Sequence, residues 1–273
     1  MSNYPQRIVC LTEETTETLY LLGQEQRIVG ISGFTVRPPR ARREKPRVSA
    51  FTSAKIDRIL ELEPDLVLGF SDLQADIAAT LVRHGVEVHL FNQRSVAGIL
   101  RMIRMLGGMI GCQKAAEDLA QKLSDQVETV RAAAAQLPQH PRVYFEEWDE
   151  PMITGIRWVS ELIEIAGGED CFTELRDKSL ARDRILADGS AVIQRNPDII
   201  IGSWCGKKFR PEKVAARPGF ARIAAVRGGA LHEVKSPIIL QPGPAALTEG
   251  LDALHDIIST WAHNTSRADA MPK

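Results

Sequence analysis

The sequence lacks the signatures of common catalytic and nucleotide-binding sites. It contains no Gly-x-x-x-x-Gly-Lys-Ser/Thr loop, no Gly-x-Gly-x-x-Gly after a strand, no His-Glu-x-x-His and no Gly-x-Ser-x-Gly. Its six histidines show no metal-ligand spacing. These absences favour a binding protein over an enzyme, and they predict no metal and no cofactor belonging to the protein itself.

Cysteine is scarce and dispersed. Cys10, Cys112, Cys171 and Cys205 lie far apart, with no Cys-x-x-Cys pair. This distribution argues against a zinc site and against a disulfide framework. Cys205 could serve as a nucleophile or a metal ligand, but no histidine or other base has a recognisable spacing to it, so an inert thiol is favoured.

An excess of one charge and long apolar runs are also missing. The formal net charge is −1, and no stretch of 18 apolar residues occurs, so we expect no nucleic-acid partner and no membrane span. The start of the chain, Met1–Glu17, has no charged segment followed by an apolar core. With Met1 as the natural start this predicts a cytoplasmic protein; a trimmed export signal would instead predict a periplasmic one.

One long helix stands out among the features that are present, at residues 113–136. Its apolar residues recur at three- and four-residue steps, the period of one helical face: Ala116, Leu119, Leu123, Val127, Val130 and Ala134. The segment contains no glycine or proline, and Pro138 ends it. We therefore predict a single rigid helix near the middle of the chain.

A repeated pattern flanks this helix. Residues 56–69 and 189–202 both read as a helix, a Pro-Asp turn and a short apolar strand ending in glycine, and the prolines Pro64 and Pro197 are 133 residues apart. Helix-Pro-Asp-strand is also a common α/β junction, which is the alternative explanation. The repeat predicts two similar lobes joined by the long helix.

Strands alternate with helices on both sides of that helix, which predicts an α/β fold with mostly parallel sheets covered on both faces. We expect an N-terminal lobe at residues 1–111, a connecting helix at 112–137 and a C-terminal lobe at 138–273. The last residues, 263–273, are expected to be a frayed tail.

Candidate ligand-binding residues follow predicted strands, where α/β lobes present their ligands. The acidic run 146–150, which contains Glu147 and Trp148, follows a strand predicted at 142–145; its carboxylates could hold a cation or the amide donors of a ligand, or form a solvated acidic loop. Phe70 and Trp204 end the two repeated strands. We expect these two rings to face each other across a cleft between the lobes, with simple inter-lobe packing as the alternative.

A basic loop precedes the third predicted strand. Six of the eleven residues at 37–47 are lysine or arginine. The loop could contact an anionic ligand, but a solvated loop stiffened by proline is the favoured interpretation.

The order of these parts resembles the solute-binding proteins for vitamin B12 and ferric siderophores, from Arg7 to about Trp261. The resemblance rests on residues 7–32, the loop at 33–46, residues 47–70, the long helix and residues 192–202. It implies two α/β lobes with little hinge closure and a bulky ligand, a corrinoid, an iron chelate or haem. Together with the acidic run, it gives the expected ligand-binding set: Thr12, Glu13, Glu14, Phe34, Thr35, Phe51, Phe70, Ser71, Glu147, Trp148, Trp204 and Cys205.

The chain departs from that family in two ways. Members are exported, whereas no export signal is seen here. They also dock on a membrane permease through one acidic residue on each lobe; Asp57 resembles the first, but its counterpart falls near the uncharged Ser190, with Asp188 close by. Losing one of two such contacts is expected to weaken docking.

The sequence thus predicts a monomeric, two-lobed binding protein that captures a corrinoid or an iron–siderophore chelate without chemistry. A cytoplasmic relative that buffers, senses or hands over the ligand is the first expectation. The alternatives are a periplasmic protein that delivers its ligand to an ABC transporter, and an enzyme that uses Glu147 or Cys205 on a bound chelate.

Overall fold

Two β-sheets organise the computed structural model, which describes residues 3–269 and contains five strands in each sheet over that range. The residues group into two units, one around each sheet. Unit 1 consists of the described residues up to Gln93 with Ala97–Ser124 and Gln241–Pro244, and unit 2 consists of Arg94–Val96, Asp125–Leu240 and the described residues from Ala245 onward. The predicted boundaries at 111 and 137 stay a prediction.

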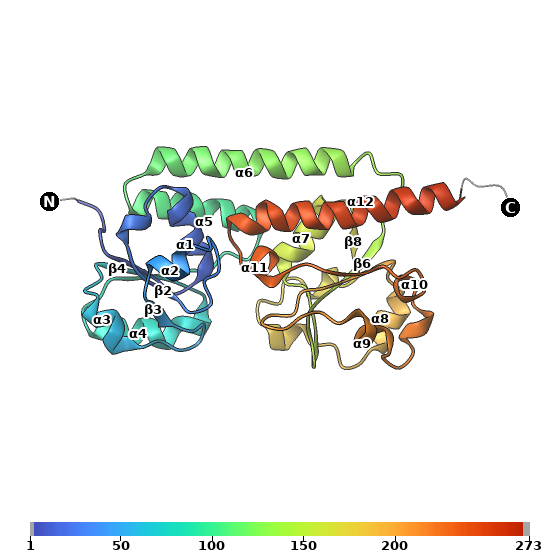
Figure 1. Ribbon diagram of the computed structural model, residues 1–273, viewed down its shortest axis with the longest axis horizontal. Coiled ribbons are helices and arrows are strands. Elements are labelled where there is room, and N and C mark those ends of the chain that lie inside the picture. Colours follow the sequence, from blue (N-terminus) through green and yellow to red (C-terminus); the bar gives the residue numbers. More distant parts are fainter. Residues whose placement is uncertain (1–2, 270–273) are drawn as a thin grey trace. The chain divides into compact units, whose positions relative to one another are not determined.

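The sheet of unit 1 is parallel throughout, in the order β3-β2-β1-β4-β5. Its strands are short and mostly buried: β1 (Ile8–Cys10), β2 (Ile28–Ser32), β3 (Arg47–Ser49), β4 (Leu66–Phe70) and β5 (Val88–Phe91). Helices α3 (Ile56–Glu61) and α4 (Ala75–Arg83) cover one face, and α1 (Glu13–Leu21) and α5 (Val96–Met109) lie on the other (Figure 1). The short helices of this unit are α2 (Ala41–Glu44), η1 (Glu25–Arg27) and η2 (Asp72–Gln74).

The sheet of unit 2 has the order β10-β9-β6-β7, and β8 also pairs with β6. Only β7 is antiparallel among the described strands: β6 (Arg142–Asp149), β7 (Met152–Thr154), β8 (Glu169–Asp170), β9 (Ile199–Gly202) and β10 (Leu231–Glu233). The α-helices are α7 (Arg157–Ile165), α8 (Ser190–Arg195), α9 (Pro211–Ala215), α10 (Ala224–Arg227), α11 (Ser236–Ile239) and α12 (Glu249–Asp269). The 3-10 turns are η3 (Thr173–Leu175), η4 (Ala181–Arg184), η5 (Phe220–Arg222) and η6 (Pro244–Leu247). The prediction of mostly parallel sheets is confirmed.

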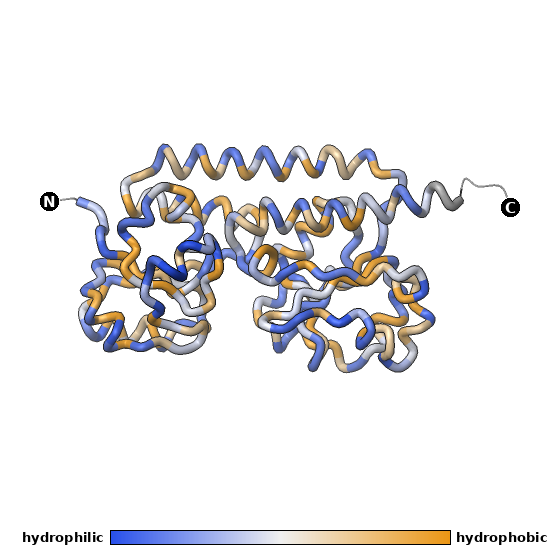
Figure 2. The backbone as a smooth tube through the Cα atoms, in the orientation of Figure 1, coloured by the Kyte–Doolittle hydropathy of each residue, from blue (hydrophilic) through white to orange (hydrophobic). Residues whose placement is uncertain are grey.

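Helix α6 (Gln113–Ala134) is the long helix that the sequence predicts. The residues of its apolar stripe are buried, Leu119 excepted, which is half-buried, and Figure 2 shows apolar and polar residues alternating along it. The helix begins among residues of unit 1 and ends among residues of unit 2, because the boundary falls between Ser124 and Asp125. It therefore connects the two units.

The Pro-Asp repeat has the same structural role in both units. In unit 1 the Asp65 carboxylate accepts hydrogen bonds from the backbone N–H groups of Gln6 (2.7 Å) and Arg7 (2.8 Å), just before β1. In unit 2 the Asp198 carboxylate accepts the N–H of Arg142 (3.0 Å), the first residue of β6. Each aspartate thus fixes the start of the strand that neighbours its own.

Two details of the sequence prediction are wrong. Strand β6 continues to Asp149, so the acidic run at 146–149 lies in the strand and not after it; pairing with β7 extends the strand. Helix α12 continues to Asp269, so residues 263–269 are helical rather than frayed, and the end of the predicted tail lies outside the described residues. No helix within residues 3–269 combines the length and the apolar character needed to cross a membrane.

Candidate functional site

Polar side chains gather at the carboxyl ends of the strands of unit 1. Thr12–Glu14 follow β1, Phe34 and Thr35 follow β2, Ser71 follows β4 and Gln93 follows β5. The carboxyl ends of parallel strands lie along one edge of their sheet, which is where open α/β sheets bind ligands. We call this set of loops the strand-end edge of unit 1.

Two glutamates at the start of α1 are buried there. The Glu14 carboxylate accepts a hydrogen bond from the Thr12 hydroxyl at 2.7 Å, whereas Glu13 Oε2 has no hydrogen-bond partner among the described residues. Burial, followed by the carboxylates of Glu14 and Glu17, raises the pKa of Glu13 to about 8. Burial also raises the pKa of Glu14 to about 7, against the lowering effect of its Thr12 bond. A hydrogen-bond donor or a cation placed here would stabilise the ionised forms.

Thr35 and Gln93 add two more buried polar groups to the strand-end edge. Thr35 Oγ1 and Gln93 Oε1 lack hydrogen-bond partners within the part of the chain that the structure describes. The amide nitrogen of Gln93 donates to the Pro242 carbonyl at 3.0 Å, which fixes the orientation of the side chain. Phe34, by contrast, is 58% exposed. The sequence prediction included Phe34 and Thr35 but missed Gln93, whose only signal was its place just after a strand.

One buried glutamine joins three loops of this edge. Gln74 Oε1 accepts the N–H of Phe70 at 2.9 Å, and its Nε2 donates to the carbonyls of Phe51 (2.9 Å) and Leu11 (3.4 Å). The neighbouring Ser71 has a left-handed backbone (φ 61°), and its hydroxyl accepts the N–H of Leu73. Gln74 was missed from sequence, because nothing local marks a glutamine whose partners are so far along the chain.

The predicted aromatic residues of unit 1 differ in exposure. Phe70 is buried, and Phe51 is half-buried in the loop after β3. Phe34 is thus the one aromatic side chain among these three with a large free surface.

In unit 2, Glu146 forms the centre of a buried polar network. Its carboxylate accepts hydrogen bonds from Tyr144 Oη (2.9 Å), from Trp204 Nε1 (3.0 Å) and from both terminal nitrogens of Arg217 (2.5 and 2.9 Å). Trp204 is 4% exposed and packs edge-to-face on Phe209 at 5.0 Å between ring centroids. The network satisfies this carboxylate and holds the Trp204 ring in the core of unit 2.

Trp148 is the more accessible tryptophan of the predicted set. It is half-buried in β6, and its indole N–H donates to the Glu150 carbonyl at 2.9 Å. The Lys207 ammonium lies 4.2 Å from the centroid of this ring and 5.1 Å from that of Trp204, and it forms an ion pair with Asp149. Lys207, which the sequence prediction missed, therefore lies over the ring of Trp148.

The remaining residues predicted in unit 2 have different surroundings. Glu147 pairs with the buried Arg184 at 2.6 Å, and Arg184 also donates to the carbonyls of Lys178 and Thr154. Cys205 is exposed just after β9. Among residues 3–269, no three His, Cys, Asp or Glu side chains are grouped so that they could hold a metal ion.

Asp57 and Asp188 lie near the starts of the two repeated helices, although the position that corresponds to Asp57 in the repeat is Ser190. Asp57 is exposed in the first turn of α3. Asp188 is exposed two residues before Ser190, the first residue of α8. Hydrogen bonds from the Ser190 hydroxyl and, second, from its backbone N–H (2.7 Å) lower the pKa of Asp188.

Comparison with known proteins gives relatives over most of the chain. The substrate-binding lipoprotein YvrC of an ABC transporter in Bacillus subtilis, described as uncharacterized, is 24% identical over 93% of this chain and 80% of its own length. A vitamin B12-binding protein of Vibrio parahaemolyticus is 26% identical over 74% of this chain and 73% of its own length. A solved structure from Staphylococcus epidermidis, described as a possible iron-binding, periplasmic solute-binding protein, has the same fold, with a TM-score of 0.80 and 24% identity over 94% of this chain and 99% of that one.

The expectation of a cytoplasmic location is wrong. It depended on the residues after Met1 alone, whereas the relatives include a lipoprotein and a periplasmic protein of the same fold. These findings point to a location outside the cytoplasm.

A sequence model described as periplasmic binding protein matches residues 8–237, a range that includes both sheets. This match covers the strand-end edge of unit 1, the connecting helix and the buried network of unit 2. The function is that of a solute-binding protein, and the chain belongs to the periplasmic binding protein family.

Proposed function

We propose that this chain is the substrate-binding component of an ABC importer and that its solute is a corrinoid. The names of the relatives from Bacillus and Vibrio support the importer and the class of solute. The observation that carries the choice of a corrinoid is a group of buried polar atoms at the strand-end edge of unit 1, on Glu13, Thr35 and Gln93, that have no hydrogen-bond partner among the described residues.

These atoms suit a ligand that donates many hydrogen bonds. Leaving a buried acceptor unpaired costs about 1–3 kcal/mol, and a ligand N–H that pairs with it recovers that cost. The rim of a corrin ring carries primary amides, which are such donors. An anionic ferric chelate would instead bring negative charge towards Glu13 and Glu14, which are buried beside each other. An uncharged ferric chelate is the second candidate.

Within this proposal Thr12, Glu13, Glu14, Thr35 and Gln93 bind the polar rim of the solute. The exposed ring of Phe34 supplies apolar contact.

The other predicted residues act less directly. Phe70, Ser71 and Phe51 are held by Gln74 and shape the edge, whereas Trp204 stabilises the core of unit 2. No step of chemistry is assigned to Glu147 or Cys205, so the solute should be recovered unchanged.

Tryptophan quenching and calorimetry with cyanocobalamin, haem, a ferric hydroxamate and a ferric catecholate test the assignment. We expect cyanocobalamin to bind most tightly. At pH 9, above the Glu13 pKa of about 8, Glu13→Gln should weaken its binding by about tenfold through loss of a charged acceptor. The matched control is Glu169→Gln, which removes an exposed carboxylate of β8 in unit 2. Tighter binding of the catecholate than of cyanocobalamin would contradict the proposal.

We also propose that Asp57 and Asp188 contact the permease of the importer. Both are exposed, and each lies at the start of one of the two repeated helices. The double variant Asp57→Asn/Asp188→Asn should lower the uptake rate in reconstituted vesicles while leaving solute affinity unchanged. Uptake equal to that of the parent protein would remove both residues from the docking surface.

A further inference from the structure

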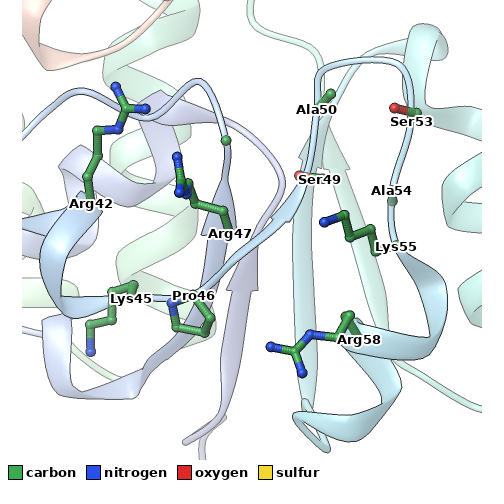
Figure 3. Close-up of a pocket in the computed structure, with 11 residues that line it drawn as sticks. Arg42, Lys45, Pro46, Arg47, Ser49, Ala50, Ser53, Ala54, Lys55 and Arg58 are labelled. Carbon is green, nitrogen blue, oxygen red and sulfur yellow. The ribbon is translucent and has the colours of Figure 1, made fainter.

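Unit 1 has a concave site with a strongly basic lining. A hollow of about 670 Å³ lies beside the edge strand β3, and none of its lining residues is acidic (Figure 3). Five of the eleven carry a positive charge: Arg42, Lys45, Arg47, Lys55 and Arg58. We call this hollow the basic pocket.

The backbone around the basic pocket is held by hydrogen bonds. The Gly33 N–H donates to the Ser49 carbonyl at 2.7 Å, which joins the end of β2 to the end of β3. The chain then folds back along β3, because the Ala50 N–H donates to the Ser53 carbonyl (2.8 Å) and the Lys55 N–H donates to the Val48 carbonyl (2.8 Å). The walls of the pocket are therefore built on the sheet.

The charged side chains come from both sides of β3. Figure 3 shows Arg42 and Arg47 on one side of the strand, and Lys55 and Arg58 on the other side with their charged ends directed towards it. Arg58 pairs with Glu61 at 3.0 Å. The other four basic side chains have no ion pair within residues 3–269, although Arg42 acts on Glu13 and Lys45 on Glu25 at longer range. The chain as a whole carries a net charge of only −1, which makes the pocket a local concentration of positive charge.

A buried hydroxyl lies among these charges. Ser49 lines the pocket, is 9% exposed, and its Oγ has no hydrogen-bond partner in the described part of the chain. A solvated basic loop would need no such group, whereas a bound anion would accept a hydrogen bond from it. This atom distinguishes a built site from a charged surface.

We propose that the basic pocket is a second binding site, for a multivalent anion of the phosphate class. Arginine and lysine bind phosphate oxygens through charge-assisted hydrogen bonds, and the volume is that of a small-molecule site. The strand-end edge of unit 1 has a different chemistry, because it carries buried carboxylates. The sequence favoured a solvated loop at 37–47. In the fold, three basic residues of that loop line one pocket together with Lys55, Arg58 and Ser49.

Calorimetry with inorganic triphosphate at low ionic strength tests this proposal. We expect binding to the full chain at one site, weakening as salt rises. The triple variant Arg47→Gln/Lys55→Gln/Arg58→Gln should lower the affinity by about tenfold or more. The control triple variant, Lys122→Gln/Lys208→Gln/Lys213→Gln, removes the same charge from exposed positions elsewhere and should change the affinity less than about twofold. An equal loss in both variants, or no binding by the parent protein, would overturn the site.

The variant Ser49→Ala tests whether triphosphate binds inside the pocket or is only attracted by the positive charge of the surface. Because Ser49 Oγ makes no hydrogen bond with any residue from 3 to 269, the variant should fold and unfold like its parent. Triphosphate affinity should nevertheless fall several-fold, as expected for one lost hydrogen bond. Unchanged affinity in Ser49→Ala would contradict a built site.

Vesicles of phosphatidylglycerol and of phosphatidylcholine distinguish a free anion from a lipid headgroup. For a small-anion site, triphosphate should displace any protein that sediments with the phosphatidylglycerol vesicles. Sedimentation that triphosphate does not reverse would show a membrane-binding surface instead and overturn the proposal.

Discussion

The two units share a scaffold but differ in how they treat a buried glutamate. Asp65 and Asp198 both accept backbone N–H groups at equivalent strand starts, and Asp198 also pairs with the Arg142 guanidinium. In unit 2, Glu146 is enclosed by four hydrogen bonds, two of them from the guanidinium of Arg217. In unit 1, Glu13 is also buried, but one of its oxygens has no hydrogen-bond partner among residues 3–269, and burial raises its pKa to about 8. The repeated fold thus carries a closed structural network in one unit and a polar group available to a ligand in the other.

The largest effect is expected from breaking the closed network. Arg217→Ala leaves Glu146 buried without its ion partner, and this should lower the free energy of unfolding by about 3–5 kcal/mol. Urea denaturation measures the change. The control is Arg182→Ala, which removes an exposed arginine and should change stability by less than about 0.5 kcal/mol. A small loss for Arg217→Ala would mean that the two glutamates are less different than the structure indicates.

A smaller effect is expected at Glu13, where a substitution should raise the free energy of unfolding at high pH instead of lowering it. Its folded pKa of about 8 exceeds its ordinary value of 4.5, so the folded chain binds more protons than the unfolded chain between these values. Stability should therefore be highest near and below pH 4.5 as far as this group is concerned, and fall as pH rises towards 8. Glu13→Gln should remove part of that fall, roughly 2 kcal/mol by pH 9.

Urea denaturation of parent and Glu13→Gln proteins between pH 5 and pH 9 tests this expectation. Glu128→Gln, on the exposed side of α6, is the control and should leave the slope as it is. Parallel pH profiles for the parent and Glu13→Gln would show that Glu13 is solvated or partnered.

The smallest effect concerns the part that the units share. Asp65→Ala and Asp198→Ala each remove hydrogen bonds to the backbone at a strand start, and each should cost about 1–2 kcal/mol in free energy of unfolding. Similar losses would sharpen the comparison, because they would show that the two Pro-Asp junctions contribute similar free energies to the stability of their units. A large loss at one position and none at the other would break it.

Local signals explain what could be predicted from sequence. The stripe of α6 and the Pro-Asp junctions depend on neighbouring residues, and the alternation of strands and helices then gave the α/β class. The long-range partners could not be read in this way: Arg217 is 71 residues from Glu146, and Arg184 is 37 residues from Glu147. Without those arginines, 146–149 reads as a solvated acidic loop, although it is part of β6.

The residues of the candidate site stay a prediction. The sequence indicated which strand ends carry polar and aromatic residues, and the structure shows which of those side chains remain available. Trp204 has its indole N–H bonded to Glu146 and its ring in the core, whereas Phe34 has most of its ring exposed. The exposure of a side chain depends on packing between segments that are distant in the sequence, so it cannot be predicted from the residues next to it.

The three hydrogen bonds of Gln74 have a consequence for how such a protein changes over generations. Because one amide holds the ends of three loops, a single codon can alter the spacing of the loops of the strand-end edge without replacing any of the other side chains there. Selection for a new nutrient could act first at this hidden position, and only later on the contact residues themselves.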